Sequence, residues 1–216
     1  PPRQSASERP ALALNGDLPA EVFVAWQQRG VGVEDVFFHQ SAGLFPSNVS
    51  DTPTVPSREP VIAAHRAAGG VPGVQVVLAW TEQSGSRSRI LSQRTSGAGV
   101  SLPLPDFAAS AFQVSEDDEF AERPALAVDG QGRFYVAWES QDLNTSAPAA
   151  VRVRSLASAF GLSADVSSDP DAPARNASNP ALAADEAFVY VAWTGRDTGS
   201  SAVDVFFVKR PTAGLR

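Results

Sequence analysis

The sequence predicts an all-β fold built from four copies of one antiparallel, four-stranded unit. One segment recurs four times, in its clearest copies as PALAVDGQGRFYVAW and PALAADEAFVYVAW. Each copy ends at one of the protein's four tryptophans, Trp26, Trp80, Trp138 and Trp193, which lie 54 to 58 residues apart. A repeat of this length indicates stacked supersecondary units. Short runs rich in Val and aromatics, bounded by Gly, Asn, Asp and Ser, indicate strands rather than helices.

The first two strands of each unit form a hairpin. The first strand starts near Pro10, Pro60, Pro124 or Pro180, and the second is the apolar run that ends in Ala-Trp. In the third unit the sequence Asp-Gly-Gln-Gly at 129–132 separates the two strands, and Asn-Gly-Asp at 15–17 has the same place in the first unit. These are turn sequences that join antiparallel strands.

Two further strands follow each tryptophan. The third strands are EDVFFHQS, SRILSQRTS, AAVRVRSLA and VDVFFVKRP, and weaker fourth segments are LFPSNVSD, FAASAFQVSED and AFGLSADVSSD. Four strands in about 55 residues is the size of a β-propeller blade. The second strand is almost continuously apolar, as expected for a blade covered on both faces by neighbouring blades. We therefore expect each tryptophan to fill the wedge between blades rather than to stack on a ligand.

A single propeller domain is expected over residues 1–216. Its repeats cover approximately 8–57, 58–121, 122–177, and 178–216 together with 1–7. The last unit stops at TAGLR, where the first unit continues from SAGLF into its fourth strand, and the N-terminal PPRQSASERP resembles the segment that enters the second unit. We expect both termini to close the last blade, which would remove exposed sheet edges. The alternative is a four-blade excerpt of a larger ring.

Composition excludes several classes of function. The formal net charge of -7 and pI near 4.8 argue against nucleic acid and against an anionic membrane surface as partners. Without cysteine there are no disulfides, thiolate metal sites or cysteine nucleophiles. No apolar run is long enough to span a bilayer. The chain does not start with Met, which a removed signal peptide would explain, and a secreted, periplasmic or cell-surface location is expected.

The segments PALAVDGQGRFYVAWES and PALAADEAFVYVAWTG resemble blades of the sialidase-like, BNR-repeat β-propeller family. The resemblance implies the fold. Family members carry an Asp box, S-x-D-x-G-x-T-W, between the third and fourth strands, whereas this chain has HQSAGLF, RSLASAFG and KRPTAGL there, without the Asp and the Trp. The boxes are thus degenerate. Arg58, in REPVI, matches the family's arginine that holds a substrate carboxylate.

Candidate site residues come from the loops that one propeller face collects. If the protein is a hydrolase, the resemblance implies Arg58 near the substrate, and Glu139, directly after Trp138, is the best single carboxylate. The wider set of candidates for a ligand-binding face is Arg58, Glu59, Glu139, Asp142, Arg196 and Asp197.

Metal and cofactor chemistry is weakly indicated. The acidic run Glu116, Asp117, Asp118 and Glu119 offers oxygen ligands for Ca²⁺, but lacks the spacing of a dedicated calcium loop, so a solvated turn is favoured. The two histidines, His39 and His65, lie in different units and do not suggest a zinc site or a catalytic triad. No cofactor is expected.

Three hypotheses remain for the function. The first is a non-catalytic binding or scaffold module that binds a protein or glycan partner through its loop face. The second is a sialidase-like glycoside hydrolase. The third is a structural subunit that assembles with further copies into a larger ring or filament. The first is favoured because the Asp boxes are degenerate and a complete catalytic constellation is not evident.

Overall fold

The computed structural model of the chain describes residues 6–14, 21–29, 32–41, 43, 45–66, 73–95, 111–157, 163–168, 175–197 and 201–215. These residues form four antiparallel sheets, the blades of an all-β propeller fold. The described helix is a single 3₁₀ turn, η1 (Thr212–Leu215). Within the described ranges, no helix has the length and apolar character needed to cross a membrane.

Each blade is a meander in which strands consecutive in sequence are neighbours in the sheet. Blade 1 contains β1 (Ser7–Leu14), β2 (Val22–Arg29), β3 (Glu34–Gln40) and β4 (Ser47–Asn48); blade 2 contains β5 (Ser57–Arg66), β6 (Val74–Ser84), β7 (Arg87–Arg94) and β8 (Phe112–Gln113). Blade 3 contains β9 (Glu119–Val128), β10 (Phe134–Asp142), β11 (Ala150–Ser155) and β12 (Ala164–Asp165); blade 4 contains β13 (Arg175–Ala184), β14 (Phe188–Arg196) and β15 (Val203–Pro211). The predicted strand order is therefore confirmed.

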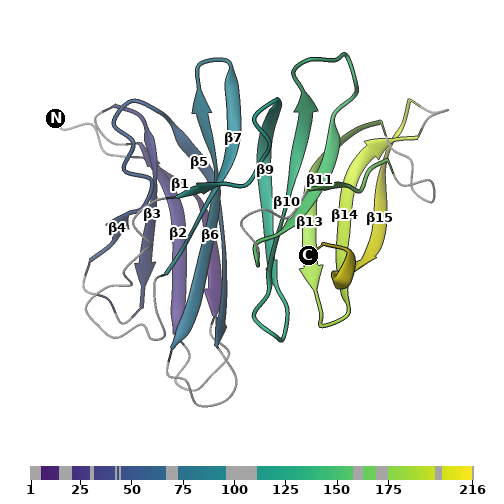
Figure 1. Cartoon of the computed structure of the whole chain (residues 1–216). Helices are drawn as coiled ribbons and strands as arrows, with labels where there is room; N and C mark the ends of the chain where they lie inside the picture. Colours follow the sequence, from purple (N-terminus) through teal and green to yellow (C-terminus); the bar gives the residue numbers. More distant parts are fainter. Residues whose placement is uncertain are drawn as a thin grey trace.

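The four blades stack face to face in sequence order, with blade 1 and blade 4 at opposite ends of the row (Figure 1). The three later tryptophans, Trp80, Trp138 and Trp193, are at most 1% exposed. Each of them packs in a cluster shared with the preceding blade; Trp80, for example, packs with Phe23 and Phe38 of blade 1. These three tryptophans thus fill the wedges between blades, as the sequence predicts, whereas Trp26 of blade 1 does not.

Burial along the second strand of each blade depends on the position of the blade in the row. In β6 and β10 consecutive residues are buried on both faces, because blades 2 and 3 have a neighbour on each side. In β2 and β14 buried residues alternate with partly exposed ones, because blades 1 and 4 have one neighbour each. Trp26 is accordingly only half-buried, stacked on Phe37 with ring centroids 5.9 Å apart.

Closure of the last blade by residues 1–7 stays a prediction, because most of that segment lies outside the described residues. Ser7 pairs with Gln28 inside blade 1 rather than with β15, and residues 1–5 lie outside the described residues. In the described part of the chain the last blade has three strands. Among the described residues, the outer faces of blade 4 and of blade 1 both expose apolar side chains.

Candidate functional site

The innermost strand of every blade contains a β-bulge at the same place. The register of β1, β5, β9 and β13 shifts where two of their residues stand opposite the tryptophan of the neighbouring strand. The first residue of each bulge precedes the repeated proline: Arg9, Glu59, Arg123 and Asn179. All four have a positive φ, between 50° and 56°.

The local sequence explains why the bulge forms there. Proline has no N–H to give to the strand ladder, so inside a sheet it is tolerated mainly at edges and bulges. A positive φ is unfavourable for Arg and Glu and costs about 1–3 kcal/mol, whereas Asn tolerates it better. A bulge changes the direction in which a side chain points. Each blade therefore has one side chain that departs from the regular alternation of the strand.

The four bulges together line one hollow of about 560 Å³. Every blade contributes its residues at and next to the bulge: Arg9, Pro10, Ala11, Glu59, Pro60, Val61, Arg123, Pro124, Asn179 and Pro180. Because the lining comes from the innermost strand of every blade, the hollow lies where these strands converge. We call it the axial hollow. Its rim is charged and its prolines are apolar, which are surfaces suited to a polar ligand that also has C–H faces.

Glu59 is the best-connected residue of the axial hollow. Its carboxylate forms an ion pair with Arg9 of blade 1, with Nη1 and Oε1 3.1 Å apart. Its other oxygen, Oε2, accepts hydrogen bonds from the backbone N–H of Arg123 in blade 3, at 3.0 Å, and from the Thr81 hydroxyl, at 3.1 Å. The Arg123 guanidinium in turn contacts Glu139, with Nη1 and Oε2 2.7 Å apart. One carboxylate therefore links three blades.

The residue directly before each bulge is polar, and it pairs across the hairpin with the polar residue that follows the tryptophan. These pairs form a second polar layer. These pairs are Glu8 with Gln27, Arg58 with Thr81, Glu122 with Glu139, and Ser178 with Thr194. Four blades thus present the same positions with different chemistry. The pair in blade 3 is the one that consists of two carboxyl groups.

Glu122 is the carboxyl group of this layer with a raised pKa. Burial raises the pKa of Glu122, and the nearby charges of Glu59 and Glu139 raise it further, although Arg123 opposes the effect. The surroundings of Glu122 therefore favour its protonated form. Environments that separate the pKa values of neighbouring carboxyl groups are typical of acid–base sites.

The structure brings some of the sequence-predicted site residues to the axial hollow and leaves others elsewhere. Glu59 lines it, and Glu139 adjoins it through Arg123. Arg58 instead contacts Glu34 of blade 1, with Nη2 and Oε2 3.2 Å apart. Burial alone would raise the pKa of Glu34, but Arg58 and Arg29 outweigh it and lower the pKa.

The remaining three candidates lie at strand ends. Asp142 is the last residue of β10, three positions beyond Glu139, and accepts a 2.7 Å hydrogen bond from the backbone N–H of Asn144. Arg196 is the last residue of β14, and Asp197 follows it. These residues are not among those that line the axial hollow.

Sequence reasoning missed three residues of the hollow: Arg9, Arg123 and Asn179. A signal was present, because each of them stands directly before a proline that recurs in every unit. A proline inside a strand indicates a bulge, and a bulge directs the preceding side chain out of the pleat. Charged or amide residues at that position in all four units then predict a polar ring on the axis.

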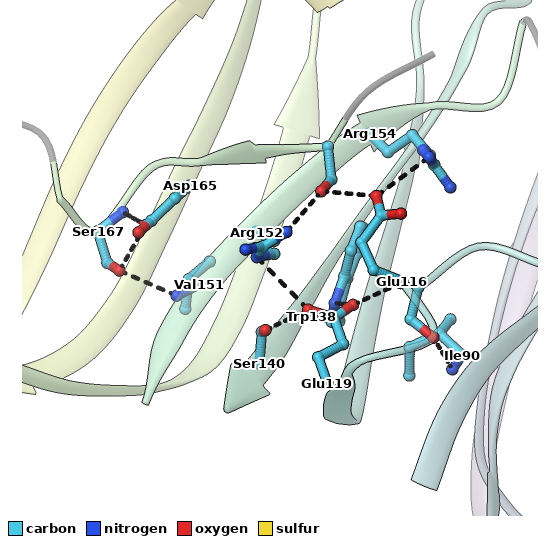
Figure 2. Close-up of polar contacts among 12 residues, drawn as sticks. Ile90, Glu116, Glu119, Trp138, Ser140, Val151, Arg152, Arg154, Asp165 and Ser167 are labelled. Carbon is cyan, nitrogen blue, oxygen red and sulfur yellow. Dashed lines mark hydrogen bonds and ion pairs between the residues drawn. The ribbon is translucent and has the colours of Figure 1, made fainter. Parts of the chain in front are cut away.

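In the acidic run at 116–119, Glu116 and Glu119 form hydrogen bonds and ion pairs with neighbouring strands (Figure 2). The carboxylate of Glu119 accepts hydrogen bonds from the Trp138 indole, the Ser140 hydroxyl and the backbone N–H of Glu116. Glu116 pairs with Arg154, Nη2 and Oε1 being 3.2 Å apart. Among the described residues no group of three or more Asp, Glu or His side chains is arranged to hold a metal ion, Asp117 and Asp118 included.

The two histidines lie in different blades. His39 is in β3 of blade 1 and His65 is in β5 of blade 2. The His65 ring packs over Gly132 of the blade 3 hairpin turn, where an added Cβ would lie 2.6 Å from its Cδ2 atom. Gly132 has φ +76°, so both its conformation and this contact require glycine. His65 is therefore used in packing between blades 2 and 3.

Comparison with known proteins yields matches only among solved structures. No protein-family model matches the chain, and no curated protein matches it. A thermostable family-43 glycoside hydrolase is 12% identical, with a TM-score of 0.47, over 94% of this chain and 70% of its own. An α-L-arabinofuranosidase from Lactobacillus brevis is 10% identical, with a TM-score of 0.47, over 98% and 75%. An exo-1,5-α-L-arabinanase from a bovine ruminal metagenomic library is 10% identical, with a TM-score of 0.46, over 94% and 70%. The resemblance to BNR repeats stays a prediction.

Proposed function

We propose that the protein binds a carbohydrate in the axial hollow and hydrolyses a glycosidic bond at the boundary between the hollow and the adjoining layer that contains Glu122. One observation carries the proposal. Glu122, a carboxyl group with a raised pKa, lies beside Glu59 and Glu139, two carboxylates that arginines hold in place. Glycoside hydrolysis needs one carboxyl group that donates a proton and one that stays ionised.

The lining of the hollow supports a sugar as ligand. Arg9, Arg123 and Asn179 offer N–H donors, and Glu59 offers acceptor oxygens, which together suit the hydroxyl groups of a sugar ring. The prolines at 10, 60, 124 and 180 supply apolar surface for its C–H faces. The net charge of -7 makes a strongly acidic polymer a poorer ligand than a neutral one.

In the proposed reaction Glu122 acts as the general acid. Its proton passes to the oxygen of the leaving sugar as the glycosidic C–O bond breaks, and a water molecule attacks the anomeric carbon. Glu59 takes the proton of that water, so the products are two sugars with free hydroxyl groups, and one proton exchange with solvent resets both carboxyl groups. Glu139 holds Arg123 in place and keeps negative charge near Glu122, which supports its raised pKa.

Binding without turnover is a second candidate, and a specific observation favours it. The Glu59 carboxylate is already bonded to Arg9, to Thr81 and to the backbone of Arg123. A carboxylate with the purely structural role of linking blades would make the same contacts. In that case the hollow is the binding face of a module for a protein or glycan partner. A secreted, periplasmic or cell-surface location would suit either function and stays a prediction.

The two candidates differ in turnover. Wild-type protein and the variants Glu122→Gln and Glu8→Gln would be assayed on a panel of 4-nitrophenyl glycosides that includes a sialoside, and sugar binding would be measured by calorimetry. Glu8 has the position in blade 1 that Glu122 has in blade 3, which makes Glu8→Gln a matched control.

Hydrolysis predicts that Glu122→Gln loses at least about 100-fold in kcat while it still binds sugar, because a general acid contributes about that much. Glu8→Gln should keep its activity. Sugar binding without turnover by the wild type would favour the binding module. Neither binding nor turnover would contradict both candidates.

A further inference from the structure

In the part of the chain that the structure describes, the outer face of blade 4 is an apolar surface that no blade covers. Val205 is 76% exposed and Phe207 59% exposed, and both lie on the side of β15 that points away from blade 3. Tyr190 stacks on Phe207 from the adjacent strand, with ring centroids 6.3 Å apart, and extends the same surface. Exposed contiguous apolar surface of this kind usually marks a contact site.

The same positions are buried in every other blade. Blade 1 has Val36 and Phe38 there, and blade 3 has Val151 and Val153, all at most 1% exposed. In each case the side chains pack against the blade that follows in sequence. The outer face of blade 4 therefore has apolar side chains, with Lys209 beside them, at positions that are covered by the next blade elsewhere in the row.

The outer face of blade 1 is the other half of such an interface. Leu12 and Leu14 are 62% and 52% exposed, and Trp26 is half-buried. At the positions of Leu12 and Trp26, blade 2 has Ile62 and Trp80, which are buried against the preceding blade. Blade 1 thus exposes the face that, in each later blade, packs against the preceding blade.

We propose that these two faces bind each other between copies of the chain, so that blade 4 of one copy docks on blade 1 of the next. The proposed contact continues an interface that the chain already forms three times, between blades 1 and 2, 2 and 3, and 3 and 4. The two faces differ from each other, so the contact is head to tail. It closes into a ring of whole copies, which covers every apolar outer face, or continues as an open chain, which leaves one such face uncovered at each end.

The proposal does not depend on the proposed function, because the docking faces and the axial hollow share no side chain: the hollow is lined by the bulges of the innermost strands. A further blade supplied by another polypeptide could cover the same faces. That occupant would leave the isolated chain monomeric, so the two cases can be separated.

The test uses complementary variants at the two ends. Phe207→Asp places a charge on the outer face of blade 4, and Leu12→Asp places one on that of blade 1; both sites are exposed, so the fold should be retained, as circular dichroism would check. Ser146→Asp, in the exposed connection between β10 and β11, adds the same charge away from both faces and serves as control. Mass would be measured by light scattering after size exclusion and by sedimentation, at about 1 to 100 µM.

Head-to-tail docking predicts that the wild type and Ser146→Asp associate, whereas each end variant alone is monomeric. An equimolar mixture of the two end variants should form a 1:1 dimer, because one intact face of each kind remains. A monomeric wild type would overturn the proposal. So would an end variant that still self-associates alone, since that result would require contact between identical faces.

Discussion

The Glu119 carboxylate accepts a 2.9 Å hydrogen bond from the indole N–H of Trp138, at the wedge between blades 2 and 3. The same carboxylate accepts a hydrogen bond from the Ser140 hydroxyl and lies 3.4 Å from Nε of Arg152 (Figure 2). Glu119 is 4% exposed. It therefore connects the start of β9 to β10 and β11 through one buried charge.

Replacing Glu119 should strongly destabilise the fold. Glu119→Ala leaves the buried indole N–H of Trp138 without its acceptor and removes the ion pair of Arg152, and we expect the free energy of unfolding to fall by about 3 kcal/mol. Asp118→Ala, at an exposed neighbouring position, should change it by less than about 0.5 kcal/mol. Urea denaturation followed by tryptophan fluorescence measures both. Equal effects would contradict the buried role of Glu119.

Asp129, in the turn at 129–132, should make the folded state less stable at low pH. Burial alone would raise the pKa of Asp129, but hydrogen bonds from the backbone and side chain of Arg133 and from the backbone of Gln131 lower it. A lowered pKa adds stability above the unfolded value of 3.8, and this is lost as the pH falls through the folded value. Asp129→Asn should therefore reduce the acid dependence below pH 3.8 and should itself be less stable at pH 7. An unchanged acid profile would contradict this role.

Glu122 should have the opposite effect on the pH dependence of stability. Because its pKa is raised by burial, the folded state holds the proton more tightly than the unfolded state. Stability should then fall as the pH rises from below 4.5, the ordinary value, through the raised value. Measured from pH 4 to 7, the wild type should lose stability relative to Glu122→Gln. Glu8→Gln is the matched control, and a constant difference between wild type and Glu122→Gln would contradict the prediction.

The bulge at Asn179 should tolerate glycine and reject a β-branched residue. Asn179 has φ 53°, which valine adopts only with strain, so Asn179→Val should cost about 1–3 kcal/mol. Asn179→Gly should be nearly neutral, because its two side-chain hydrogen bonds, to Ser178 and Thr194, are both 3.3 Å long. Thermal unfolding of the two variants measures the difference. Equal melting temperatures would show that the bulge carries no conformational demand.

The blades were predictable because their signals are local and repeated. The Ala-Trp run, the turn at 129–132 and the period of the tryptophans each mark a strand or a boundary, and β10 and β14 lie where those signals place them. The burial of Trp138 also followed from the repeat alone.

The axial hollow was less predictable because it depends on register. Whether Glu59 or Arg58 points to the axis is decided by a bulge that adds one residue opposite Trp80, and a shift of one residue reverses the direction of a side chain. Arg58 consequently faces Glu34. The sequence leaves open whether blades 1 and 4 meet, because contact between them is a property of the whole row.

The repeated bulge also has a consequence for engineering. Backbone geometry at positions 9, 59, 123 and 179 is set by the following proline and by the tryptophan opposite, while the side chains themselves already differ between blades. A combinatorial library at these four positions, restricted to Gly, Asn, Asp, Arg and Glu, would therefore vary the chemistry of one hollow on a constant scaffold. Positions 9, 123 and 179 could be varied one blade at a time, whereas position 59 would be varied together with position 9, because Glu59 links blades 1, 2 and 3.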